Sequence, residues 1–285
     1  MPIRLKLSLA ARAVPEISGL KDAVYRAFTA KGIRHVGACS FSDLPPLLEV
    51  RAASRLPVNP QSVIVCATPY FCGDYPQRNL ARYAICDDYH QTGGALLGEI
   101  CAGLAKSFPG HDFRPFIDIS PIPEVKAAHL AGLGVIGLHG QLILPDYGAY
   151  TFIGCVVTDL AIEPSQPSPG TCLECEACLQ ACPTKALGRQ GLNRELCRSY
   201  ITQKTGELTV REQEQIKAGK MVWGCDICLD ACPLCKNAAH TPLERMRRSP
   251  LPILNRENLD VALKRKAYGY RGRKVLERNL ALLGL

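Results

Sequence analysis

The spacing of apolar residues predicts alternating helices and strands over the first 165 residues. Within 16–35, apolar side chains recur at helical intervals, at Ile17, Leu20, Val24 and Phe28. Lys31-Gly32 closes this predicted helix. The stretch 62–67 is apolar from Val63 onward and ends at Thr68-Pro69, which predicts a buried strand. By the same rules we expect further strands at 36–38 and 114–119, helices at 47–55, 89–107 and 122–133, and a hairpin-like stretch at 141–158.

This alternation predicts an α/β layer fold for 1–165, because helices can then cover both faces of a sheet. The proline-rich and aromatic loop 69–80 is expected to line a site. A proline-rich linker, 162–170, leads into a cysteine-rich module over about 166–240. The remaining segment, 241–285, is predicted to form helices that return to the first domain.

A run of closely spaced cysteines carries the strongest chemical signal in the chain. Cys172, Cys175 and Cys178 stand three residues apart, and Cys182-Pro183 follows. This spacing is typical of a loop that holds a 4Fe–4S cluster through soft thiolate ligands. A zinc ribbon is the alternative, but it uses two well-separated cysteine pairs and no third cysteine in the loop.

A second, shorter run suggests a second cluster. Cys225, Cys228 and Cys232-Pro233 repeat the pattern with one cysteine missing, and Cys197 lies between the two runs. In two-cluster ferredoxins the fourth cysteine of each run binds the other cluster. That crossed arrangement predicts one cluster on Cys172, Cys175, Cys178 and Cys232, and another on Cys182, Cys197, Cys225 and Cys228.

The other seven of the 15 cysteines lie mostly in apolar runs. We expect them to be small buried side chains of a protein from a reducing cytoplasm, although Cys235 lies near enough to the clusters to be an extra thiol there. They are Cys39, Cys66, Cys72, Cys86, Cys101, Cys155 and Cys235. Arg4, Lys6 and Arg12 interrupt the apolar residues at the N-terminus, so neither a signal peptide nor a membrane span is predicted there.

The net charge of +8 is concentrated at one end of the chain. Residues 236–285 hold 12 Lys and Arg against 4 Asp and Glu, and the rest of the sequence is balanced. A basic segment of this kind can contact a phosphate backbone. It can equally be an ordinary solvated surface that compensates the charge of two anionic clusters.

Two further motifs are expected to have structural roles. Gly132, Gly134 and Gly137 match the GxGxxG pattern, but a helix precedes them where dinucleotide binding requires a strand. A tight turn with close backbone approach is therefore predicted. Asp88, His90 and Gly93 match the DxHxxG pattern of cobalamin proteins that supply a lower histidine ligand. That pattern needs a loop, whereas His90 begins a predicted helix, so histidine ligation is not expected.

Beyond these motifs, the chain resembles the epoxyqueuosine reductase family, which are cobalamin and iron–sulfur enzymes of tRNA modification. The resemblance keeps its order over most of the chain. It rests on Arg82-Tyr83-Ala84, Asp88-Tyr89-His90, Arg114 to Pro121 with Glu124, Ala131 to Gly137, Gly148 to Gly154, Cys197 to Ile201, both cysteine runs, and Arg271 to Leu283.

The resemblance implies a nitroreductase-like corrinoid domain with a two-cluster ferredoxin module packed on the cobalamin. It implies an oxidoreductase that converts epoxyqueuosine to queuosine in tRNA, with electrons passing from two 4Fe–4S clusters to cobalamin and then to the epoxide. An external low-potential donor, a monomeric state and a cytoplasmic location are also expected. The positions that match the family's corrinoid contacts are Ala81, Asp118, Leu142, Ile153, Ser199, Cys225 and Asp226.

Asp118 matches the catalytic acid of that family. Burial against the corrin would raise its pKa and let it hold a proton for the epoxide oxygen. The alternative is that Asp118 caps the helix expected after it, which would lower its pKa.

Some positions depart from the family pattern. Ile85-Cys86-Asp87 stands where Gly-Arg is usual, Leu138 replaces a lysine, and no C-terminal helical repeats follow. A free nucleoside or another small electrophile is therefore an alternative substrate, and an electron-carrier role is a third possibility.

Overall fold

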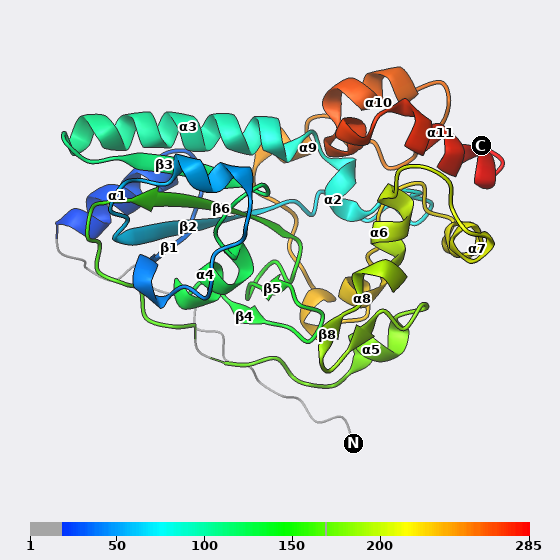
Figure 1. The fold of residues 1–285 in the computed structure, drawn as a ribbon, viewed down its shortest axis with the longest axis horizontal. Helices are drawn as coiled ribbons and strands as arrows, with labels where there is room; N and C mark the ends of the chain where they lie inside the picture. The colour runs from blue at the N-terminus through cyan, green and yellow to red at the C-terminus, as the bar shows by residue number, and fades with distance from the viewer. Residues whose placement is uncertain (1–18, 169) are drawn as a thin grey trace.

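The computed structural model describes residues 19–168 and 170–285 (Figure 1). The N-terminal positions that bear on a signal peptide, and Ile17, lie outside the described residues. In the first part of the chain the helices are α1 (Leu20–Thr29), α2 (Arg82–Ile85), α3 (Tyr89–Ser107) and α4 (Glu124–Leu130), with 3₁₀ turns at Phe41–Asp43 and Arg51–Arg55. The strands are β1 (His35–Ser40), β2 (Ser62–Pro69), β3 (Phe113–Ile117), β4 (Val135–Ile136), β5 (Leu142–Ile143) and β6 (Thr151–Thr158).

Four of these strands form an antiparallel sheet in the order β1-β2-β6-β3. Strand β2 lies inside the sheet, with Val63 paired to Cys39 on one side and to Val157 on the other. The sheet is therefore antiparallel throughout, whereas helices that alternate with strands often accompany a parallel sheet.

Both faces of the sheet are covered, which explains why β2 reads as one apolar run. Val63 and Val65 point to the face that packs against α4, while Ile64 and Cys66 point to the face that packs against α1 and α3. Figure 1 shows α3 and α4 on opposite sides of the sheet. Successive side chains of a strand alternate between faces, so an apolar residue is needed at every position.

Several predicted boundaries need correction. Helix α3 occupies the predicted 89–107, but the first helix ends at Thr29, before Gly32, whose φ is +81°. The helix predicted at 47–55 is a 3₁₀ turn over Arg51–Arg55, and the one predicted at 122–133 is only Glu124–Leu130. The stretch 141–158 is not a hairpin, because β5 pairs with β4 and β6 pairs with β2 and β3.

The cysteine-rich part consists of short elements. Its helices are α5 (Ala177–Ala181), α6 (Arg198–Gln203), α7 (Val210–Gly219) and α8 (Ile227–Asp230), with β7 (Leu187–Gly188), β8 (Gly191–Leu192) and 3₁₀ turns at Arg194–Leu196 and Pro233–Cys235. Helices α9 (Glu244–Arg247), α10 (Leu259–Arg265) and α11 (Arg273–Leu282), and a 3₁₀ turn at Ala267–Arg271, follow.

As expected, the C-terminal helices return to the earlier chain. Leu276 and Leu280 of α11 share one apolar cluster with Leu80 and with Trp223 from the cysteine-rich part. Lys266, which is 5% exposed, donates to the Asp87 carboxylate at 2.9 Å. Part of the basic excess of this end is thus used inside the molecule. Among the described residues, no helix is both long enough and apolar enough to cross a membrane.

Candidate functional site

The eight cysteines of the two runs gather around two separate cavities. Cys172, Cys175, Cys178 and Cys232 line a small cavity beside Leu138 and His139. Cys182, Cys197, Cys225 and Cys228 line a much larger one. These are the two sets of four that crossed ligation predicts, with Cys197 in the place of the missing loop cysteine.

The local backbone explains how three cysteines in one short run face the same cavity. Glu174 and Glu176 have positive φ values of 49° and 57°, so the chain coils tightly between Cys172 and Cys178. Helix α5 begins directly after this coil and packs against α8 of the second run. Pro183 ends the first run and keeps the chain out of a further helical turn.

Six of the other seven cysteines are buried, as predicted, and Cys72 is half-buried. Burial raises the pKa of Cys39, Cys66 and Cys101 to about 12. These thiols are inert apolar side chains at neutral pH.

The larger cavity has a volume of about 330 Å³ and is mainly apolar. One wall consists of aromatic side chains from the first part of the chain, and the other is the cysteine set of Cys182 with the loops around it. Its lining includes Tyr70, Tyr83, Tyr89, Phe152, Ser199, Cys225, Asp226 and Leu229. A flat macrocycle with apolar faces and a polar rim fits such a cavity, because the aromatic side chains can contact one face of the ring and the polar groups can contact its rim.

Three of the predicted corrinoid contacts, Ser199, Cys225 and Asp226, line this cavity. The others do not. Ala81 is fully buried and donates its N–H to the Trp223 carbonyl at 2.8 Å. Leu142 and Ile153 belong to the core cluster between the sheet and α4, and their neighbours Gln141 and Phe152 reach the cavity in their place.

Asp226 fastens the cysteine-rich part to the loop before α2. Its carboxylate accepts the Arg82 N–H at 2.7 Å and a bond from Arg78 at 3.1 Å. Burial raises the pKa of Asp226 to about 6, although both arginines act against that rise. Its contacts hold the wall of the cavity in place.

Asp118 lies in a second cavity, of about 260 Å³, that shares Tyr83 and Tyr89 with the larger one. It directly follows β3 and has a left-handed φ of 60°, and its side chain is 52% exposed. A non-glycine residue in this conformation is uncommon and is held by its surroundings. The carboxylate is therefore directed into the space beside the aromatic wall.

His90 connects Asp118 to Asp88. Its Nε2 lies 3.0 Å from Asp118 Oδ2, and its Nδ1 lies 2.7 Å from Asp88 Oδ1. These hydrogen bonds raise the pKa of His90 to about 9, so both ring nitrogens carry protons at neutral pH. Both ring nitrogens of His90 are thus engaged by carboxylates in this structure.

The expected rise in the pKa of Asp118 is wrong for this geometry. The hydrogen bond from His90 lowers that pKa, and burial opposes the effect only in part. The capping alternative is also wrong, because α4 begins after Pro123 and Ser120 Oγ accepts the Ile122 N–H at 3.1 Å. The proton that was expected on Asp118 lies on His90 instead.

Glu124 was missed as a functional candidate by the sequence analysis. Burial raises the pKa of Glu124 to about 8, and the negative charge of Asp118 adds to the rise. Its Oε1 is buried without a hydrogen-bond partner among the described residues. Glu124 is therefore the carboxyl near this cavity that keeps a proton at neutral pH, and its place among the positions that carry the family resemblance was the signal that could have found it.

The glycine motif has the structural role that was predicted. A Cβ at Gly132 would lie 2.1 Å from the Gln166 carbonyl oxygen, and one at Gly134 would lie 2.2 Å from that of Ile143. The backbone passes too closely for any side chain at these positions.

Comparisons with known proteins agree with this architecture. Residues 52–119 match the family described as epoxyqueuosine reductase QueG, DUF1730, and residues 171–234 match the 4Fe–4S double cluster binding domain. The epoxyqueuosine reductase of Lactococcus garvieae is 33% identical over 217 residues, which are 73% of this chain and 61% of that protein. The enzyme of Staphylococcus aureus is 30% identical over 71% of this chain and 55% of its own length. The chain thus spans little more than half the length of these curated relatives.

Solved structures share the fold. The epoxyqueuosine reductase of Streptococcus thermophilus superimposes with a TM-score of 0.79 and 23% identity, over 93% of this chain and 81% of that one. A structure of an epoxyqueuosine reductase with a modified tRNA stem loop gives the same TM-score. A catabolic reductive dehalogenase matches less closely, with a TM-score of 0.53, 18% identity and 35% of its length covered. The resemblance to the epoxyqueuosine reductase family is therefore confirmed in both sequence and fold.

Proposed function

We propose that this protein reduces epoxyqueuosine to queuosine in tRNA, with two 4Fe–4S clusters and a corrinoid as cofactors. The observation that carries the proposal is the position of the large aromatic-lined cavity. It lies against the Cys182 set on one side and next to the Asp118 cavity on the other. The cavity proposed for the corrinoid, the cysteine set proposed to feed it and the Asp118 site therefore adjoin one another, and the relatives named above are epoxyqueuosine reductases.

Each set of four cysteines is proposed to hold one cluster. The set that lines the large cavity, with Cys182 and Cys225 among its members, would deliver electrons there. The set with Cys172 and Cys232 would receive electrons from an external low-potential donor. Four thiolates per cluster complete the usual ligand number.

The corrinoid would lie in the large cavity, against Tyr89 and Phe152 on one side and Ser199 and the Cys225-Asp226 turn on the other. Bound there, it would supply low-valent cobalt, a strong nucleophile and reductant. Tyr89 and Phe152 stack with ring centroids 3.9 Å apart and present a rigid apolar wall. No protein histidine is expected on its lower face.

Releasing the epoxide oxygen as water takes two electrons and two protons, and one of these protons is proposed to come through Asp118 and the other from solvent. Its carboxylate lines the second cavity and accepts the His90 Nε2–H, with 3.0 Å between Nε2 and Oδ2, so the pair can deliver that proton to an oxygen that accepts it. Asp88 fixes the other side of the ring, which keeps His90 oriented.

The basic surface of the C-terminal segment is proposed to contact the tRNA backbone. Arg247, Arg248, Lys264 and Lys274 are exposed there. Such contacts weaken as salt rises. One relative was solved with a modified tRNA stem loop, which supports an RNA substrate for this chain. We also propose that the protein acts as a monomer in the cytoplasm.

The direct test is mass spectrometry of tRNA digests after anaerobic incubation of the loaded protein with epoxyqueuosine tRNA and a strong reductant. The proposal expects queuosine to appear only when both the corrinoid and the clusters are present. If the free nucleoside is converted as fast as epoxyqueuosine tRNA, tRNA is not the specific substrate. If the clusters load but no corrinoid binds, the protein would be an electron carrier and not a reductase.

The likeness to a reductive dehalogenase fold favours one alternative, in which another small electrophile is reduced in the same cavity. Turnover of a halogenated phenol, with no conversion of epoxyqueuosine tRNA, would establish it.

A further inference from the structure

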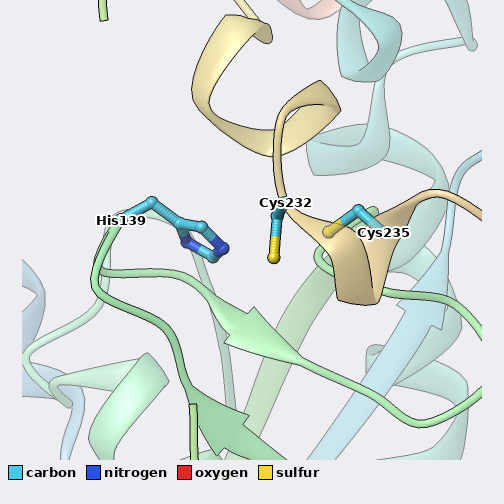
Figure 2. Close-up of side chains that lie close together, drawn as sticks. All are labelled: His139, Cys232 and Cys235. Atoms are coloured by element: carbon cyan, nitrogen blue, oxygen red, sulfur yellow. The ribbon is translucent and has the colours of Figure 1, made fainter. Parts of the chain in front are cut away.

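A buried histidine, His139, lines both the large cavity and the small cavity around the Cys232 set. His139, Cys232 and Cys235 are 5%, 7% and 3% exposed. One nitrogen of the ring and the two sulfur atoms all lie within 4.8 Å of one another. Figure 2 shows the imidazole directed toward Cys232, which lies between the ring and Cys235.

The backbone fixes this ring. A Cβ at Gly137 would lie 2.7 Å from His139 Cε1 and 2.8 Å from Nε2, so the ring occupies space that only glycine leaves open. The Gly140 N–H donates to the Gly137 carbonyl at 2.8 Å and closes a turn around the histidine. The side chain is thereby held in one orientation.

The hydrogen bonds of the ring identify its tautomer. The Gln141 N–H donates to Nδ1 at 3.1 Å, so Nδ1 carries a lone pair and the proton of the neutral ring is on Nε2. Nε2 is buried and has no hydrogen-bond partner among the described residues. An unused buried donor of this kind costs about 1–3 kcal/mol, which indicates that an acceptor belongs beside it.

The acceptor is expected to be a sulfur atom. Cys235 Sγ already accepts the Ala149 N–H at 3.3 Å. Cys232 lies closer to the ring in Figure 2 and belongs to the four-cysteine set around the small cavity that His139 also lines.

We infer that His139 donates its Nε2–H to the Cys232 thiolate and so raises the reduction potential of the cluster held by Cys172, Cys175, Cys178 and Cys232. The inference rests on the ligand assignment of the proposed function. A hydrogen bond to a ligand sulfur stabilises the extra negative charge of the reduced cluster more than it stabilises the oxidised one. The hydrogen bond therefore makes this cluster easier to reduce than it would be without His139.

The test is an anaerobic redox titration of both clusters followed by electron paramagnetic resonance. His139→Asn keeps an acceptor for the Gln141 N–H but is too short to reach Cys232. His139→Gln places an amide N–H farther out. His129→Asn is the matched control, because His129 bonds the Gly134 carbonyl at 2.9 Å on the same glycine-rich segment.

We expect His139→Asn to lower the reduction equilibrium constant of one cluster about tenfold, which is about 59 mV for one electron. The other cluster should keep its potential, His139→Gln should recover part of the loss, and His129→Asn should match the wild type.

Two results would overturn the inference while the two-cluster assignment stands: unchanged potentials in His139→Asn with about eight irons bound, or equal shifts of both clusters. Four or fewer irons in the fully loaded wild type would instead refute the proposed ligand sets, and the inference with them.

Discussion

The sheet and the cysteine-rich segment are stabilised in different ways. In the sheet, β2 and β6 are eight residues long and bury apolar side chains on both faces, with Val63, Ile64 and Val65 fully enclosed. In 171–234 the helices α5 and α8 have five and four residues, and the buried side chains include the cysteines Cys178, Cys182 and Cys232 themselves. The sheet has a large apolar core of its own. Within 171–234 a small apolar cluster of Ile201, Leu208 and Ile216 packs α6 and α7, and we expect the loops around α5 and α8 to depend on metal–thiolate bonds.

The groups proposed to take part in the reaction lie where the two regions meet. Aromatic and ionisable groups at the margin of the rigid sheet face the cysteine-rich segment across the large cavity. On the proposed function, the sheet positions the reacting groups and the cysteine-rich segment supplies the electrons.

The largest expected effect comes from removal of iron. Anaerobic chelation should lower the hydrogen-exchange protection of α5 and α8 by at least about a thousandfold, because the ligand bonds fold this segment. Strands β2 and β6 should keep their protection, as measured by mass spectrometry of exchanged peptides. A parallel loss of protection in both regions would show that the sheet also depends on the clusters.

A cavity in the sheet core should have the next largest effect. Phe116 is 2% exposed and packs in the cluster under α4, so Phe116→Ala should cost about 3–5 kcal/mol in denaturant unfolding of the loaded protein. Leu192→Ala, at a 53% exposed position of the cysteine-rich segment, is the control and should cost under about 0.5 kcal/mol. Iron content should remain unchanged in both variants. If Leu192→Ala lowered the free energy of unfolding as much as Phe116→Ala, the two regions would not differ in how they are stabilised.

Loss of the Asp118 carboxylate should affect turnover and leave cofactor loading intact. Asp118→Asn cannot hold the His90 proton as a carboxylate does, so we expect turnover to fall about a hundredfold. Asp112→Asn is a suitable control, because Asp112 forms a surface ion pair with Arg114 at 3.0 Å, away from both cavities. Wild-type turnover in Asp118→Asn would exclude Asp118 from proton delivery.

The smallest effect is a pH dependence of stability that depends on His90. Its pKa is raised from 6.5 to about 9 in the folded protein, so the stabilisation is complete below about pH 6.5. It is lost as the pH rises through 9. Because the pair is partly exposed, we expect only about 1 kcal/mol. Urea unfolding between pH 6.5 and 10 should show this decline in the wild type and not in His90→Gln. The same decline in both proteins would assign it to other groups.

Local patterns in the sequence were sufficient for the features that depend on neighbours along the chain. The apolar run of β2, the limits of α3 and the grouping of the eight cysteines follow from residue type and spacing. Cluster ligands are set by short loops, and a helix or strand is encoded by the period of its apolar side chains.

Other features were decided only by the tertiary structure, because they depend on residues that are distant in the chain. Strand β6 pairs with β2 and β3, and no local pattern distinguishes that from a hairpin with β5. The pKa of Asp118 is lowered because β3 ends beside His90 at the start of α3. His139 lies beside Cys232 because a glycine turn brings it there. The charge state of a group and the partner of a buried donor are set by surroundings that only the folded chain assembles.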